Sequence, residues 1–163
     1  MASANEPGAA AGGPAGGASG PGGPRGSRPG DDPAARVEAV LRRLGTDPAG
    51  LEIVAELAGL PAGSARRIAA DLVRAGRAVE AGGPDRFLHR DGVAAAARRA
   101  AAGIGEFHRQ MPGRPGIEPH PLRIMTEVIP EVFDAALAAL RADGRIVEEN
   151  GLIRLAEFRP PPD

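Results

Sequence analysis

The sequence predicts a mainly α-helical protein with small β-hairpins, built from two tandem copies of one module behind a disordered N-terminal tail. Three observations lead to this fold class. The first 33 residues are dominated by Gly, Pro and Ala, the rest of the chain shows apolar positions at helical spacing, and the order of elements recurs after about 68 residues. At 163 residues the chain has room for two such modules.

The tail, residues 1–33, contains 10 Gly, 6 Pro and 7 Ala and almost no larger apolar side chain. Such a segment buries too little surface to offset its conformational entropy, so we expect it to be disordered. It has no basic start followed by an apolar core, and no stretch of the chain approaches the roughly 18 apolar residues that span a bilayer. We therefore expect a soluble, cytoplasmic protein that does not engage a membrane. The absence of Cys is compatible with this location and removes disulfides and cysteine-bound zinc.

The first module is expected at residues 34–90 and begins with a helix. Asp32 has the character of a helix cap, Pro33 suits the first turn, and Gly45 ends the helix. Apolar side chains between them follow the i, i+3, i+4, i+7 spacing of one helix face: Val37, Val40, Leu41 and Leu44.

Two more helices and a hairpin complete this module. A short helix opens at Gly50-Leu51, and a third follows Leu60-Pro61 with the apolar stripe Ala65, Ile68, Ala69 and Leu72. The segments "RAVEA" and "RFLH", separated by "GGPD", have the pattern of two short strands joined by a glycine-containing loop.

The second module, residues 91–163 with a long connecting helix at its start, repeats this order. A shift of 68 residues carries the third-helix stripe onto Phe133, Ala136, Leu137 and Leu140, and carries the strand "GRAVE" onto "GRIVE". The final strands flank Asn150-Gly151, a dipeptide typical of tight hairpins. Three helices followed by a hairpin form a winged helix, a variant of the helix-turn-helix. Because each copy has only about 60 residues, we expect the two to support each other through the connecting helix.

Phe107-His108 stands where the connecting helix gives way to a proline-broken stretch. An offset of 67 aligns Val37, Val40 and Leu44 with Ile104, Phe107 and Met111, and it puts His108 in place of Leu41. This predicts Phe107 in the core of the second module and His108 at the core edge, with its ring nitrogens hydrogen-bonded. A catalytic or ligand role for His108 is the weaker alternative, because no nucleophile or partnering acid for it is evident. Pro112 ends the helix and Gly116 is expected to permit the next turn.

These residues carry a resemblance to a known family. The stretch "EFHRQMPGRPGI", the following "PLRIM" and the hairpin "GRIVEENGLIRL" resemble a winged-helix segment of the bacterial selenocysteine-specific elongation factor (SelB type). The likeness covers roughly residues 34–159. By motif order, the two modules of this chain resemble the first two winged helices of that family. The matching motif positions are Phe107, His108, Pro112, Gly116, Leu122 and Arg123.

The resemblance implies a translation factor that binds GTP and selenocysteinyl-tRNA through a GTPase part, followed by four winged helices of which the last binds an mRNA hairpin. This sequence departs from that plan. It contains no Lys, so it holds no G-x-x-x-x-G-K-[ST] phosphate loop, and it ends before a hairpin-binding module. The resemblance therefore implies a non-catalytic arm, either a fragment or a separately encoded piece, and no cofactor. We expect any mRNA hairpin or ribosome contact to involve missing or separate modules.

The most plausible nucleic-acid surface is the third helix of the first module, with Arg66, Arg67 and Arg74 pointing outward. An ordinary solvated face is the competing interpretation. Net charge from the sequence is +2 over residues 34–90 and −3 over 112–163, so the second module is the less suitable one for phosphate contact. The three His residues show no metal-ligand spacing, so no metal is expected.

Three hypotheses of function follow. The first is a selenocysteine-incorporation arm that is associated with RNA or the ribosome and is not an enzyme. The second is a DNA-binding transcriptional regulator that uses the helix carrying Arg66 and Arg67. The third is a protein-interaction adaptor that docks through the acidic second module. No small-molecule substrate is evident, and the sequence does not predict the oligomeric state.

Overall fold

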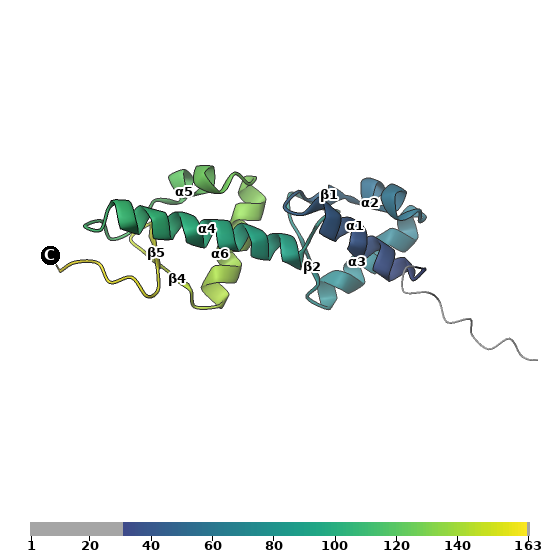
Figure 1. Ribbon diagram of the computed structural model, residues 1–163. Helices are drawn as coiled ribbons and strands as arrows, with labels where there is room; N and C mark the ends of the chain where they lie inside the picture. The colour runs from purple at the N-terminus through teal and green to yellow at the C-terminus, as the bar shows by residue number, and fades with distance from the viewer. Residues whose placement is uncertain (1–30, 163) are drawn as a thin grey trace, which may run out of the picture.

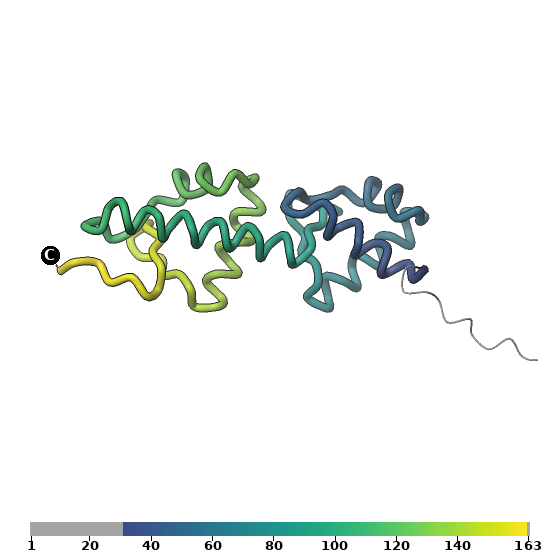
Figure 2. Tube along the Cα trace, viewed as in Figure 1, coloured from purple at the N-terminus to yellow at the C-terminus, as the bar shows by residue number. Residues whose placement is uncertain are grey.

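The computed structural model describes residues 31–162, so nearly all of the predicted tail lies outside the described residues. Two modules lie end to end, and the long helix α4 runs from one into the other (Figures 1 and 2). The elements follow in the order α1 Pro33–Leu44, β1 Ala49–Gly50, α2 Leu51–Ala58, α3 Ala62–Arg74, β2 Ala78–Glu80, β3 Arg86–His89, α4 Arg90–Gln110, α5 Pro119–Thr126, α6 Pro130–Ala142, β4 Ile146–Glu149 and β5 Leu152–Leu155.

Helix α1 begins and ends as its residues predict. The side chain of Asp32 caps it by accepting a hydrogen bond from the Ala34 N–H at 3.2 Å, and Pro33 occupies the first helical position, where no amide donor is needed. The helix therefore starts at the last residue of the segment expected to be disordered. Gly45 ends it with φ +61°, a conformation that favours glycine.

The core of the first module is an apolar cluster inside α1, α2, α3 and the sheet. The sheet has the order β1-β3-β2 with antiparallel pairing. The buried members of the apolar cluster include most residues of the expected helix stripes. Leu44 and Ile68 of these stripes are only partly buried, at the edge of the cluster. The fully enclosed side chains of the cluster include Val37, Val54, Ala65 and Ala69.

The second module repeats this arrangement around α4, α5 and α6, with β4 and β5 forming a two-stranded antiparallel wing. Asn150 and Gly151 form its turn with φ of 54° and 77°, which is the backbone of a type I′ hairpin. The predicted α6 stripe of Phe133, Ala136, Leu137 and Leu140 is buried. The winged-helix fold class is thereby confirmed for both copies.

Strand β1 was not predicted, because two residues carry no periodicity. It pairs Ala49 with Phe87, and the second module has the same feature as a single bridge between Ile117 and Ile153. These positions correspond under the repeat, at offsets of 68 and 66 residues. In both copies the chain just before the second helix pairs with the second wing strand.

Strand β3 joins the two modules because its side chains alternate between two buried faces. Phe87 belongs to the first apolar cluster, whereas its neighbour Leu88 belongs to the second cluster together with residues of α4 and α6. Successive side chains of a strand point to opposite faces, so one residue step separates the two cores. The expected support between modules therefore comes from β3 as well as from the connecting helix.

A close backbone approach fixes where α4 begins. A Cβ placed on Gly92 would lie 2.1 Å from the carbonyl oxygen of Gly45, so only glycine allows the first turn of α4 to meet the end of α1. No helix within the described part of the chain is long and apolar enough to cross a membrane.

Candidate nucleic-acid interface

The third helix of the first module presents the predicted arginines on its outer face. Arg66, Arg67 and Arg74 are all exposed. The Arg66 guanidinium forms an ion pair with Asp85 at 2.6 Å, and Arg74 forms one with Asp71 one turn earlier. Exposed pairs of this kind contribute little to stability, but each reduces the positive field that the helix offers to a phosphate.

The corresponding helix of the second module, α6, exposes Glu131 and Asp134 on the same face. Its Arg141 forms an ion pair with Glu148 of the wing at 2.6 Å. Carboxylates on this face would repel a nucleic-acid backbone. Part of the acidic character expected for the second module is thus on the helix that would otherwise read a groove.

Phe107 and His108 lie at the end of α4, but their burial differs from the prediction. His108 is buried, at 7% exposure, whereas Phe107 is only partly buried and packs against the edge of the second cluster. Met111, aligned with Leu44 in the repeat, is exposed. The strict offset fails here because α4 ends at Gln110 and Met111 has already left helical geometry (φ −131°).

His108 is held by the end of the last strand and the segment that follows it. Its Nε2 accepts a hydrogen bond from the Leu155 N–H at 3.3 Å, and its ring stacks on Phe158 with centroids 3.6 Å apart and planes 7° from parallel. Its Nδ1 is buried without a partner among the described residues. Burial, with a smaller contribution from the Arg154 cation, lowers the pKa of His108 below its usual value, so the ring is held neutral.

Phe158 is the residue of this joint that sequence reasoning missed. It follows β5 beyond the repeated pattern, so periodicity gives it no role. The only signal in the sequence is that Phe158 is one of four Phe residues in a chain with no Trp or Tyr. An aromatic residue so rare in the composition is a reasonable candidate for packing.

The remaining family-motif positions shape the same joint. Pro112 follows the end of α4 at the surface, Leu122 of α5 is completely buried, and Arg123 is half-buried with its carbonyl accepting from Thr126 Oγ1 at 2.7 Å. Gly116 has no left-handed φ, so it is not required for a turn as expected. Instead, a Cβ on Gly116 would lie 2.7 Å from the carbonyl oxygen of Ile153.

A second buried polar group lies where α1, β3 and α4 meet. The Asp91 N–H donates to His89 Nδ1 at 3.0 Å, so the proton of the neutral ring is on Nε2, which donates to Glu38 Oε1 at 2.9 Å. Arg77 also reaches Glu38, at 2.9 Å. Burial raises the pKa of Glu38, but the His89 hydrogen bond and the cations of Arg77 and Arg42 outweigh it and leave the pKa below its usual value. These contacts are internal, and they orient structural elements.

Within residues 31–162, no three His, Cys, Asp or Glu side chains are grouped closely enough to hold a metal ion. His89 and His108 are each occupied by protein contacts. Exposed arginines are among the functional groups that remain available to a partner.

The fold and these surfaces define the chain as a tandem winged-helix protein with arginine-bearing faces. Residues 102–155 match the family model described as "Elongation factor SelB, winged helix". Most of the second module is therefore similar to a winged helix of elongation factor SelB, and all six motif positions of the joint lie within the match. No curated protein matches the sequence.

Two of the solved structures that are similar to the chain share little sequence identity with it. One is the mRNA-binding domain of elongation factor SelB from E. coli in complex with SECIS RNA, with 14% identity and a TM-score of 0.48, covering 76% of this chain and 97% of that one. The other is a protein from Corynebacterium diphtheriae, with 15% identity and a TM-score of 0.27, covering 74% of this chain and 26% of that one.

Proposed function

We propose that this chain is a non-catalytic winged-helix arm of a selenocysteine-specific translation elongation factor, acting in the cytoplasm during selenocysteine incorporation. The observation that carries the proposal is the SelB-type match over residues 102–155. The six motif residues inside it are used structurally, around the end of α4, and none is presented as a catalytic group. The arm would work next to RNA or the ribosome and would hydrolyse no GTP itself.

The shape of the molecule suits an arm. Helix α4 has 21 residues and is therefore about 31 Å long. It packs against α1 and β3 at its start and against α5, α6 and β5 further along, so both modules are fixed to one rigid rod. We propose the divisions 34–90 and 91–163 as the functional modules, with residues 1–33 as a disordered extension.

Contact with nucleic acid is proposed first for α3, through Arg66, Arg67 and Arg74. Arg67 is the member of this set with no carboxylate within ion-pair distance among residues 31–162. Ion pairs at Arg66 and Arg74 would exchange for phosphate contacts on binding, at little cost because they are exposed. Such contacts fix position and carry no sequence information by themselves.

The test compares an RNA hairpin, duplex DNA of equal length and purified ribosomes. Fluorescence anisotropy at ~50 and ~200 mM salt measures nucleic-acid affinity, and co-sedimentation measures ribosome binding. We expect binding to RNA or ribosomes that exceeds binding to the duplex and weakens with salt. In Arg66→Ala/Arg67→Ala, the slope of log K against log salt should fall by about 1 to 2.

Other binding results would support the rival functions. Tighter binding to duplex DNA than to RNA would support a transcriptional regulator that uses the same helix. Binding to none of the three ligands would leave the adaptor hypothesis and would rule out the RNA-associated role.

A further inference from the structure

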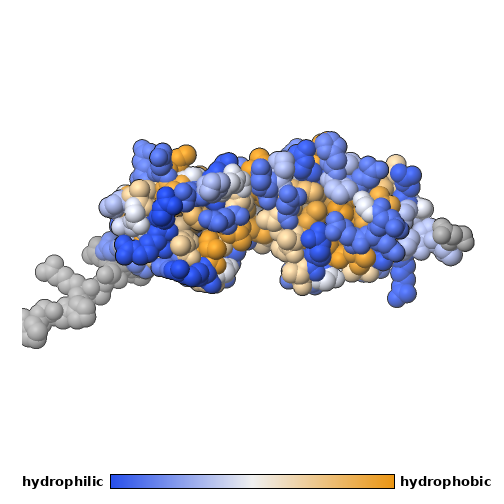
Figure 3. All heavy atoms as spheres, turned by 180° about the vertical axis from the view of Figure 1, so that it is seen from behind, coloured by the Kyte–Doolittle hydropathy of each residue, from blue (hydrophilic) through white to orange (hydrophobic). Residues whose placement is uncertain are grey.

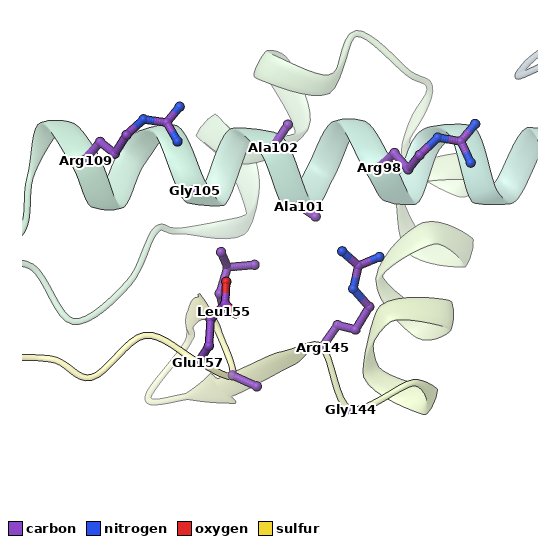
Figure 4. A pocket seen from close by; sticks show the side chains of 10 residues that line it. Arg98, Ala101, Ala102, Gly105, Arg109, Gly144, Arg145, Leu155 and Glu157 are labelled. Carbon is purple, nitrogen blue, oxygen red and sulfur yellow. The ribbon is translucent and has the colours of Figure 1, made fainter.

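A groove with basic walls runs between α4 and the start of the second wing. Arg98 and Arg109 of α4 form one wall, and Arg145, Leu155 and Glu157 form the other, around a hollow of about 590 Å³ (Figure 4). In the close-up the Arg145 side chain extends from the turn after α6 toward α4, and the guanidinium groups of Arg98 and Arg109 lie along the helix.

The groove continues toward the first module. A second hollow of about 390 Å³ shares Arg98 and Arg145 with the first and adds Arg90, Val79 of β2 and Asp143. We call the two hollows together the arginine groove, defined by Arg90, Arg98, Arg109 and Arg145. The arginine groove spans the seam between the modules. Figure 3, which views the molecule from behind, shows hydrophilic and hydrophobic residues interspersed over the surface.

The floor of the groove lies close to the helix backbone because its side chains are small. The floor residues are Ala94, Ala97, Ala101, Ala102 and Gly105. Arg98 and Arg109 are eleven positions apart, which places them on one face of α4 about 16 Å apart along the axis. Since each strand of duplex DNA carries a phosphate about every 3.4 Å of helix axis, a span of this length is enough for more than one phosphate of a strand.

The charges of the groove are available to a ligand. Across residues 31–162, Arg90, Arg98 and Arg145 have no carboxylate within 4.0 Å, in contrast to Arg66 and Arg74 of α3. Arg109 pairs with Glu106 on its own helix. Glu157 and Asp143 are the carboxylates that line the hollows, one in each, so cations outnumber anions four to two. Like charges that line one groove repel each other, and an anion bound among them offsets that repulsion.

We propose that the arginine groove binds the sugar-phosphate backbone of an RNA strand. This inference rests on the proposed function for the choice of RNA, and on the groove itself for the place and mode of contact. The groove lining contains no aromatic side chain on which a base could stack, so the contacts go to phosphates and are independent of base sequence. The SelB-type module would thus contact RNA through the seam beside its long helix, whereas its acidic α6 face would not.

The experiment uses the full chain and a variant with two groove charges removed, Arg98→Ala/Arg145→Ala. Its matched control is Arg43→Ala/Arg99→Ala, which removes the same charge from exposed positions outside the groove with no ion pair among the described residues. Anisotropy with a short labelled single-stranded RNA is measured from ~50 to ~200 mM salt. Circular dichroism and the unfolding midpoint check that all three proteins are folded.

We expect the groove variant to lose roughly tenfold in affinity at the lower salt concentration. Its slope of log K against log salt should decrease by about 1.4, the value for two single-strand phosphate contacts. The control should change far less in both quantities. Equal losses in variant and control would mean that only net charge matters, which overturns the groove as a site.

Other outcomes separate this inference from the proposed function. If the wild-type chain sediments with ribosomes and the groove variant binds RNA as tightly as wild type, the groove proposal fails and the proposed function stands. If the wild-type chain binds neither RNA nor ribosomes, both fail. If labelled poly-glutamate binds more tightly than RNA and the groove variant abolishes that binding, the groove serves an acidic protein segment, and the RNA assignment is overturned.

Discussion

His108 shows at the scale of one residue how a polar group is kept inside a small module. Its ring takes the position that Leu41 has in the first copy, and it meets Phe158 and the Leu155 amide in place of aliphatic neighbours. The stack on Phe158 and the hydrogen bond to Nε2 suit the neutral ring. Because Nε2 accepts a hydrogen bond, the proton of the neutral ring is on Nδ1. Burial and, to a smaller extent, the nearby Arg154 cation disfavour a second proton on the ring.

The lowered pKa of His108 predicts a stability that depends on pH. A folded-state pKa below the ordinary value of about 6.5 means that the unfolded chain binds the proton more readily. The contribution of His108 is therefore complete above about pH 6.5 and is lost as the pH falls through the folded-state pKa. Urea unfolding between about pH 7 and 5 should show a smaller pH-dependence in His108→Leu than in wild type, although His108→Leu also leaves the Leu155 amide without an acceptor.

His120 provides the control, because its side chain is exposed at the start of α5. His120→Gln should retain the pH slope of the wild type. If the free energy of unfolding of His108→Leu depends on pH as steeply as that of wild type, the neutral His108 ring contributes nothing to stability between about pH 7 and 5.

At the scale of elements, each copy is closed by a contact between the chain before its second helix and the second wing strand. In the second copy this contact is the pair of hydrogen bonds between Ile117 and Ile153, at 2.9 and 2.8 Å. Gly116 lies beside it, against the Ile153 carbonyl. The glycine matters because two backbone segments approach each other, and the turn itself needs no glycine there.

Gly116→Ala should therefore lower the free energy of unfolding by about 1–3 kcal/mol, because the new methyl forces the backbone pair apart. Gly113→Ala is a matched control three residues earlier, where a Cβ meets nothing within 4 Å. It should be neutral or stabilise slightly by reducing the entropy of the unfolded chain. Equal effects of the two substitutions in urea unfolding would contradict the close-approach argument.

At the scale of the whole molecule, two small cores are joined into one stable unit. Leu88 is 1% exposed and belongs to the second cluster although its strand belongs to the first module. The Glu38 network ties α1 to β3 and to the first turn of α4. Two modules of this size gain cooperativity when they share buried surface.

Leu88→Ala should cost about 2–5 kcal/mol, as truncation of a fully buried leucine usually does. Hydrogen exchange followed by mass spectrometry should then show lower protection in α1 and in α6, because the shared packing couples the two modules. Leu57 is 54% exposed. Leu57→Ala should therefore change the opening free energy that hydrogen exchange measures by no more than about 0.5 kcal/mol in α1 and in α6. Loss of protection in only one module would show that the two fold independently.

The sequence itself determined the helices, the wing strands and their duplication, because these follow from local periodicity and caps. These signals act over only a few residues, so the sequence predicts them directly. Examples are the stripe from Val37 to Leu44, the Asp32 cap and the Asn150-Gly151 turn. The family motif could be recognised for the same reason, because it is a short run from Phe107 to Arg123.

Only the tertiary structure decided which side chains meet. Phe158 stacks on His108, Gly116 approaches Ile153, and Arg98 and Arg145 line one hollow. Each of these contacts joins positions that lie more than 35 residues apart. No local pattern encodes such pairs, because they depend on where α4 directs the second wing. The candidate sites differ accordingly: the α3 arginines are visible as a helix face, whereas the arginine groove exists only once the modules have packed along α4.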